Sequence, residues 1–216
     1  MSRYVRPSIE AAVFRDGDGR VIEYGNRWVG LPPEGTYSVD THPERFAALH
    51  AVADALIAHL GDTYDVEIEE GADVVADLIR APSHDVVRAV RVRPRDPACA
   101  SVTVVMDAYP GIYLHAGVLH DFHYPVCGCD ACDSTWQAEA DRLEQQVLAV
   151  VSGHYREKLE RREGEPSVSY AFVYPDGASS GESREPEMAP ERYAAAESAL
   201  RTIAAEWAAW SKRTSG

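Results

Sequence analysis

Apolar residues recur at helical spacing in three stretches of the chain. The first repeat runs from Phe46 to Leu60, and Thr41 with Glu44 just before it has the spacing of a capping box. A capping hydroxyl followed by such a repeat marks the start of an amphipathic helix. The pattern therefore predicts a helix over residues 42–60.

Two further helices are predicted in the second half of the chain. One begins near Ser134, which pairs with Gln137 as a second capping box, and it runs toward Tyr155. The other begins near Pro190, because proline is favoured in the first turn of a helix. Residues 156–165 have no apolar face and are interpreted as a solvated helix end or loop. The apolar stripe of the last helix is expected to consist of Tyr193, Leu200, Ile203, Trp207 and Trp210.

Between the first two helices the pattern changes to the alternation that is typical of β-strands. Four stretches rich in β-branched residues and tyrosine predict an antiparallel meander. A further strand is predicted over residues 168–174, followed by a flexible loop over residues 175–190. The expected fold is α+β, one domain over residues 1–216 in which an antiparallel sheet is covered by about three amphipathic helices. The four stretches comprise residues 65–69, 86–92, 102–106 and 112–119.

The last two stretches of the meander are expected to form a hairpin that turns at Tyr109–Gly111. This register gives one coherent apolar face and puts His115 on the opposite, more polar face. It also places Cys99 opposite Asp121, near the cysteines that follow. The expected pairs are Val102 with Val118, Val104 with Ala116, and Met106 with Leu114.

Composition and charge narrow the class of protein. With 45% hydrophobic and 26% charged residues, the 216-residue chain has the composition of a globular domain. Thirty-five acidic residues against 21 Lys and Arg leave a formal charge of −14, which disfavours nucleic acid and anionic membrane surfaces as partners. Because no long apolar run occurs, neither membrane insertion nor export is expected.

Three of the four cysteines lie close together, at Cys127, Cys129 and Cys132. Such tight spacing is poorly suited to a disulfide framework and favours a reducing, cytoplasmic location. The CxxC spacing from Cys129 to Cys132 chelates a tetrahedral ion, and Gly128 lets the chain bend so that Cys127 joins them. The motif therefore predicts a zinc site.

A fourth zinc ligand is expected from a residue near this run. His123 is the predicted ligand, with Cys99 and His120 as alternatives. The expected register favours His123 and Cys99, because it places both side chains on one face of the sheet.

Two other interpretations of the cysteine run are weighed against zinc. A CxxC pair before a helix is typical of redox-active thiols, because the helix dipole stabilises a thiolate. Asp121, Asp130 and Asp133 disfavour a free thiolate and favour a bound cation instead. In the other interpretation, the three cysteines are unligated thiols in a tight turn.

The run Cys-Gly-Cys-Asp-Ala-Cys-Asp-Ser over residues 127–134, with the helical pattern that follows it, resembles an uncharacterised bacterial family known only as a domain of unknown function. The segment Tyr-Ser-Val-Asp-Thr-His-Pro-Glu-Arg-Phe over residues 37–46 is similar to an upstream motif of that family. The resemblance covers residues 24–155 and implies no activity.

The sequence contains no phosphate-binding loop, dinucleotide fingerprint or nucleophile elbow. The leading hypothesis is therefore a noncatalytic binding or accessory protein, whose zinc site pins the sheet to the following helix and whose partner is a protein or a small molecule. One alternative is a metal-dependent hydrolase that uses His115, His120 and His123. The second alternative is a thiol redox protein, and the sequence does not decide whether the chain is an enzyme.

Overall fold

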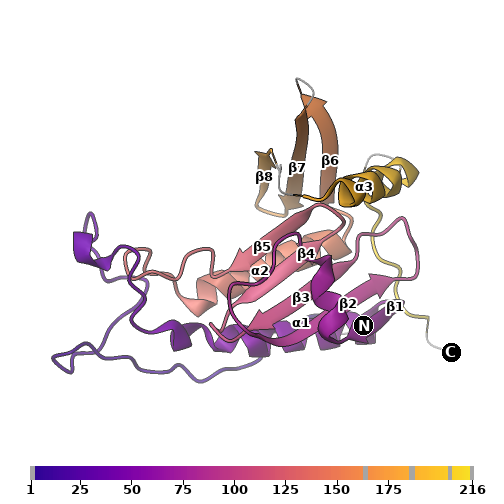
Figure 1. Cartoon of the computed structure of the whole chain (residues 1–216). Coiled ribbons are helices and arrows are strands. Elements are labelled where there is room, and N and C mark those ends of the chain that lie inside the picture. Colours follow the sequence, from indigo (N-terminus) through magenta and orange to yellow (C-terminus); the bar gives the residue numbers. More distant parts are fainter. Residues whose placement is uncertain (1–2, 163–164, 185–187, 204–205, 215–216) are drawn as a thin grey trace.

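The computed structural model describes residues 3–162, 165–184, 188–203 and 206–214, and a five-stranded sheet lies at its centre (Figure 1). The strands are neighbours in chain order and every pair is antiparallel, which confirms the predicted meander. The middle strand is buried along its whole length, so it is covered on both faces. The strands are β1 (Val66–Glu70), β2 (Val86–Pro94), β3 (Val102–Asp107), β4 (Ile112–Ala116) and β5 (His120–Tyr124).

The register of the β3–β4 hairpin differs from the predicted one by two residues. Val104 pairs with Leu114 rather than with Ala116, so the predicted pairs are wrong. The reason lies in Asp107, whose Oδ1 accepts a hydrogen bond from the backbone N–H of Gly111 at 2.7 Å and closes the turn one residue earlier than expected. A shift of two residues leaves each side chain on its predicted face.

The strand predicted over residues 112–119 ends at Ala116. Gly117 has a φ of 68°, a left-handed conformation that favours glycine, and it begins a second tight turn that leads into β5. A Cβ atom at this position would overlap the carboxylate of Glu157. Glycine is therefore required here both for the backbone conformation and for the close approach of a side chain from another strand.

Two helices, α1 (Ala48–Thr63) and α2 (Trp136–Val151), pack against one face of this sheet and against each other. The helix predicted over residues 42–60 begins as a short 3-10 turn, η2 (Pro43–Phe46), and continues as α1. Full burial of each leucine or isoleucine contributes roughly 1.5–3 kcal/mol. The apolar stripe of α1 comprises Leu49, Val52, Ala53, Leu56, Ile57 and Leu60, all of them buried.

Neither predicted capping box forms. The hydroxyl of Thr41 donates to the carboxylate of Asp130, and the turn that follows has no side-chain cap. The cap of α2 is Thr135 rather than Ser134, and its Oγ1 accepts a hydrogen bond from the N–H of Ala138 at 3.2 Å. At the first helix, Thr41 therefore binds Asp130, which is distant in the sequence, instead of capping the backbone of the adjacent turn.

The other face of the sheet is partly covered by the connection between β1 and β2. This connection contains a 3-10 helix, η3 (Ala72–Asp77), and it packs Val74 and Leu78 against Ala89 and Val105. The segment before η2 consists mainly of loops around one further 3-10 turn, η1 (Glu34–Thr36) (Figure 1).

A second, three-stranded antiparallel sheet stands at the edge of the first (Figure 1). Its first strand occupies residues 156–162 of the segment that was predicted as a helix end or loop over residues 156–165, of which residues 163–164 lie outside the described chain. Its third strand occupies part of the predicted loop 175–190, of which residues 185–187 lie outside the described chain. The rings of Tyr155 and Phe172 stack at 4.8 Å and join the apolar cluster of the first sheet. The strands are β6 (Tyr155–Arg162), β7 (Glu165–Tyr174) and β8 (Gly177–Ser183).

The third helix, α3 (Pro190–Thr202), lies beside β6 and is shorter than its predicted stripe (Figure 1). Trp207 and Trp210 do not belong to it, so their predicted place on the helix is wrong. Both indoles lie in a non-helical segment and are buried in the main core, where Trp210 Nε1 donates to the carbonyl of Ala100 at 2.9 Å. No helix within the described residues has the length and apolar surface needed to span a bilayer.

The buried carboxylate of Glu157 connects the two sheets and the C-terminal segment. Its side chain has no exposed surface. A buried carboxylate is tolerated only when donors surround it, because desolvation of an unpaired charge is costly. Its partners lie at 2.8–3.1 Å and are the backbone N–H groups of Val118 and Leu119, the indole of Trp207, the hydroxyl of Tyr155 and the ring Nδ1 of His120.

We expect Glu157→Gln to lower the free energy of unfolding by about 3–5 kcal/mol. The amide NH₂ group cannot accept the hydrogen bonds that the carboxylate oxygen accepted, so buried donors lose their partner. Urea denaturation followed by tryptophan fluorescence measures this change. The matched control is Glu160→Gln, an exposed residue of the same strand, which is expected to stay within about 0.5 kcal/mol of the wild type. Equal stability of the two variants would contradict the role given to Glu157.

Candidate metal centre

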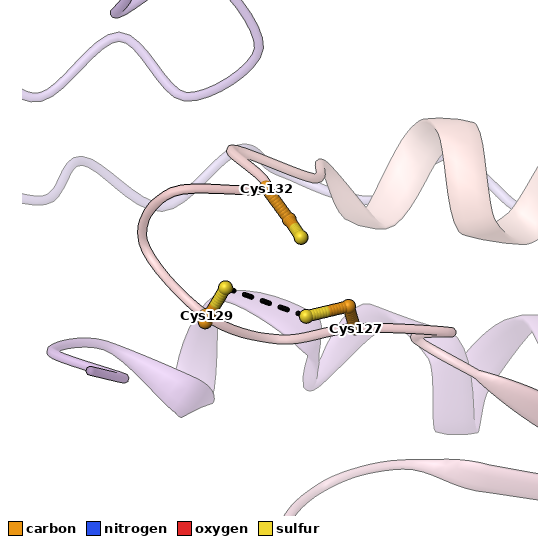
Figure 2. Close-up of side chains that lie close together, drawn as sticks. All are labelled: Cys127, Cys129 and Cys132. Atoms are coloured by element: carbon orange, nitrogen blue, oxygen red, sulfur yellow. Dashed lines mark hydrogen bonds between the residues drawn. The ribbon is translucent and has the colours of Figure 1, made fainter. Parts of the chain in front are cut away.

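The three clustered cysteines lie in the turn between β5 and α2, and their sulfur atoms point toward one another (Figure 2). All three Sγ atoms lie within 4.8 Å of one another, and the thiol of Cys127 donates to Sγ of Cys129 at 3.4 Å. Cys127 and Cys129 are half-buried, Cys132 is exposed, and all three are free thiols. This arrangement can hold a metal ion.

The backbone of this turn is bent and closely packed. The N–H of Cys132 donates to the carbonyl of Cys129 at 3.2 Å, which closes the CxxC turn. Gly128 lies so close to Tyr109 that a Cβ atom would overlap the phenol oxygen. Tyr109 is itself held in place, because its hydroxyl donates to the carboxylate of Asp40. Gly128 therefore allows the bend that was predicted from the sequence, and it also allows the close contact with Tyr109, which was not predicted.

Two arginines hold the carbonyl groups of the cysteine loop. Nη2 of Arg45 donates to the carbonyl of Gly128 and Nη2 of Arg27 donates to the carbonyl of Asp130, both at 2.5 Å. The side chains are only 2% and 13% exposed, respectively. Both guanidinium groups lie over the ring of Tyr24, at 4.3 and 4.4 Å from its centroid. The loop is thus ordered by contacts that involve no sulfur atom.

The aspartates of the run pair with these arginines. Asp133 Oδ1 accepts from Arg27 Nε at 2.7 Å, and Asp130 Oδ1 lies 3.6 Å from Arg27 and 3.7 Å from Arg45. Asp121 lies on β5, outside the group that the three sulfur atoms form. Because guanidinium groups balance Asp130 and Asp133, these carboxylates disfavour a thiolate less than the sequence alone indicated.

Residues 37–46, the upstream segment of the sequence resemblance, lie directly against the cysteine loop. The N–H of Asp130 donates to the carbonyl of Val39 at 2.7 Å, and Arg45 belongs to the same segment. The two stretches of similar sequence are therefore neighbours in space. That similarity was the one sequence signal for this contact, and no local pattern pointed to Arg27 or Arg45.

Hydrogen bonds within the cluster shift the pKa values of two of its thiols in opposite directions. Burial raises the pKa of Cys129, but hydrogen bonds from the backbone N–H of Cys132 and from the thiols of Cys127 and Cys132 outweigh burial and lower this pKa to about 7. Hydrogen bonds that tie its proton to Cys127 and Cys129 raise the pKa of Cys132 to about 12. Cys129 is therefore a stronger acid than Cys132.

Neither His123 nor Cys99 lies in the sulfur group. His123 is on β5, where its ring meets that of Tyr113 edge-on at 4.6 Å and where burial lowers its pKa. Cys99 lies before β3, in the apolar core at the opposite end of the hairpin, and its thiol donates to the carbonyl of Ala209 at 3.4 Å. The predicted position of Cys99 opposite Asp121 is wrong, because the hairpin register and the second turn differ from expectation.

The three histidines of the hydrolase hypothesis do not converge on one point. His115 Nδ1 lies 2.7 Å from Asp121 Oδ1, and His120 Nδ1 lies 3.1 Å from Glu157 Oε2. The strand pairing places His115 and His123 on one face of the sheet and His120 on the other. Within the described part of the chain, the three clustered cysteines are the one group of three or more side chains close enough to share an ion.

The chain belongs to the family of unknown function DUF6226, whose sequence model matches residues 10–214. The match confirms the resemblance to an uncharacterised family and extends it beyond residues 24–155. No curated protein and no solved structure gives a significant match.

We expect Gly128→Ala to lower the free energy of unfolding by about 1–3 kcal/mol, because the new methyl group must displace the ring of Tyr109. Gly35→Ala is the control, since a Cβ atom there meets nothing within 4 Å. Its stability is expected to be unchanged or raised by up to about 1 kcal/mol. Thermal and urea denaturation of both variants measure the difference, and a fully stable Gly128→Ala would show that this contact is loose in solution.

Proposed function

We propose that this member of the DUF6226 family is a noncatalytic binding or accessory protein whose cysteine loop binds one structural zinc ion. Cys127, Cys129 and Cys132 supply three thiolate ligands. The observation that carries the proposal is the gathering of three unoxidised sulfur atoms within 4.8 Å in one turn of the chain. Thiolates at CxxC spacing are preferred zinc ligands.

The separations of the sulfur atoms suit a tetrahedral ion. With Zn–S bonds of about 2.3 Å, two thiolates of one tetrahedral site lie roughly 3.8 Å apart. The Sγ atoms of Cys127 and Cys129 are 3.4 Å apart, and no two of the three sulfur atoms are more than 4.8 Å apart. Small side-chain rotations are therefore enough to bring the three sulfur atoms to this spacing. Arg27 and Arg45 already order the backbone of the loop, which reduces the entropy that metal binding must overcome.

A metal ion here joins the end of β5 to the start of α2. The loop also contacts residues 37–46, so the ion strengthens a junction of three chain segments. The large apolar core lies elsewhere, and zinc therefore adds local stability without deciding whether the chain folds. Three thiolates donate much charge to the ion and weaken it as a Lewis acid, which favours a structural role over hydrolysis.

His123 stays the predicted fourth ligand, and it must move toward the sulfur atoms to bind. The proposed partner is a protein or a small molecule in the cytoplasm, because a formal charge of −14 disfavours nucleic acid and anionic membranes.

Thiol redox activity is the second candidate. The pKa of Cys129 near 7 favours it, since the thiolate is the attacking species. The hydrogen bond between Cys127 and Cys129 also places a second sulfur at 3.4 Å. The two functions differ in one measurable respect, because a bound zinc ion protects the thiols whereas a redox pair is oxidised reversibly.

We expect about one zinc ion per chain in protein purified under reducing conditions without a metal-binding tag. Removal of zinc by a chelator is expected to lower the melting temperature by about 5–10 °C and to expose the loop between β5 and α2 to proteolysis, while most of the fold persists. Elemental analysis, calorimetry and limited proteolysis measure these effects. Metal-free protein of equal stability would contradict the zinc site.

The variants Cys129→Ser and Cys99→Ser form a matched pair. The first is expected to lose zinc, whereas the second keeps it, because Cys99 lies in the core. His123→Ala tests the fourth ligand, and about tenfold weaker zinc binding is expected if this ring coordinates the ion. A reversible disulfide between Cys127 and Cys129 in a zinc-free protein would instead establish the redox function.

A further inference from the structure

A cavity of about 520 Å³ lies between α3 and the face of the sheet that carries His115. It is separate from the cysteine loop, and none of the three clustered cysteines lines it. Its floor consists of side chains from neighbouring strands of the five-stranded sheet, and its wall consists of α3 and the end of η3. The residues that matter here are Arg91, Arg93, Ser101, His115, Asp77 and Arg192.

The lining of this cavity has the opposite charge from the chain as a whole. Three arginines and one carboxylate, that of Asp77, line the cavity, whereas the protein as a whole has a formal charge of −14. Burial raises the pKa of Asp77, but hydrogen bonds from Arg91 and Thr103 outweigh burial and lower it, so Asp77 is ionised at neutral pH. Low-dielectric walls concentrate such a positive potential and attract anions from solution.

The three guanidinium groups are neutralised to different degrees. Arg91 binds Asp77 through two nitrogens, at 2.6 and 2.5 Å, and Glu69 reaches it from β1 at 2.6 Å. Arg192 donates to the carbonyls of Ala76, Asp77 and Leu78, which fix its position without cancelling its charge. The side chain of Arg93 is exposed and makes no hydrogen bond or ion pair with any described residue, although the paired residue on β1 is Glu67. Arg93 and Arg192 therefore present two guanidinium groups that no carboxylate of a described residue binds.

His115 adds an oriented ring to this lining. Its Nδ1 lies 2.7 Å from Asp121 Oδ1, and Asp121 Oδ2 accepts from the backbone N–H of Ile79 at 2.7 Å. The carboxylate holds the proton on Nδ1, so Nε2 is left to accept a hydrogen bond from a ligand hydroxyl. Ser101 contributes a hydroxyl to the same cavity.

We infer that this cavity binds the phosphate group of a small molecule. Two guanidinium groups without a carboxylate partner can bind a phosphate dianion, and the planar fork of arginine suits its oxygen atoms. The hydroxyl of Ser101 can donate to a phosphate oxygen, and Nε2 of His115 can accept from a hydroxyl group of the organic part of the ligand. A volume of about 520 Å³ exceeds that of inorganic phosphate and leaves room for the organic part of a phosphomonoester.

Isothermal titration at constant ionic strength tests this inference, with inorganic phosphate, glycerol 3-phosphate and succinate as probes. Saturable binding of one phosphate probe per chain is expected, with succinate at least about tenfold weaker although it carries the same charge. Tighter binding of glycerol 3-phosphate identifies a phosphomonoester as the ligand class, and equal binding identifies inorganic phosphate. No saturable binding of either probe, or equal binding of succinate, would overturn the inference.

Arg93→Ala and Arg95→Ala form the decisive pair of variants. Both arginines are exposed, and Arg95 follows directly after the end of β2, but Arg95 pairs with Glu67 at 2.7 Å and does not line the cavity. Arg93→Ala is expected to weaken phosphate binding about tenfold or more, and Arg95→Ala less than about twofold. Equal effects would show that only the overall charge matters, which contradicts a defined site.

The phosphate site and the zinc site are tested independently. A variant with Cys127, Cys129 and Cys132 all replaced by serine is expected to bind phosphate as the wild type does. A change in its phosphate affinity beyond about twofold would contradict the assignment of two separate sites.

Discussion

The fold depends on a carboxylate that has no contact with solvent. Glu157 lies on the first strand of the second sheet, yet its oxygens accept from the β4–β5 turn of the first sheet and from the indole of Trp207. Desolvation of such a group is tolerable only when every donor is in place, so the three segments must come together for any of them to be stable. This explains why Gly117 must be glycine, because any side chain would occupy the space of the carboxylate.

At the cysteine loop, a second set of polar contacts also holds together segments that are distant in the sequence. Arg27 and Arg45 are nearly buried and donate to loop carbonyls that no strand or helix satisfies. Loops carry unpaired backbone groups, and an arginine with several donors can satisfy them across a long sequence separation. The cysteine sulfur atoms are brought together by this framework, and the proposed ion would add to an order that already exists.

Much of the architecture follows from local pattern, and the errors occur where distant side chains act. Repeats of apolar residues predict α1, α2 and the meander because each element buries one face. The register shift arises from a single side chain, Asp107, and the strand over 155–162 has no apolar alternation because its key inward residue is charged. The cysteine cluster was predictable because its three cysteines lie within six residues, whereas the arginines that contact the loop come from 83 and 103 residues away.

The positions of the two candidate sites also follow from these polar contacts. The cysteine loop continues from the end of β5, whereas the cationic cavity includes Gly117 and Val118, at the opposite end of the same hairpin. The N–H of Val118 is bound to Glu157 at 2.8 Å, so the buried carboxylate fixes part of the cavity wall. Arg192 fixes another part by joining α3 to the end of η3. The cavity is therefore shaped by contacts between the two sheets and α3, none of which involves the cysteine loop, and its geometry does not require a metal ion there.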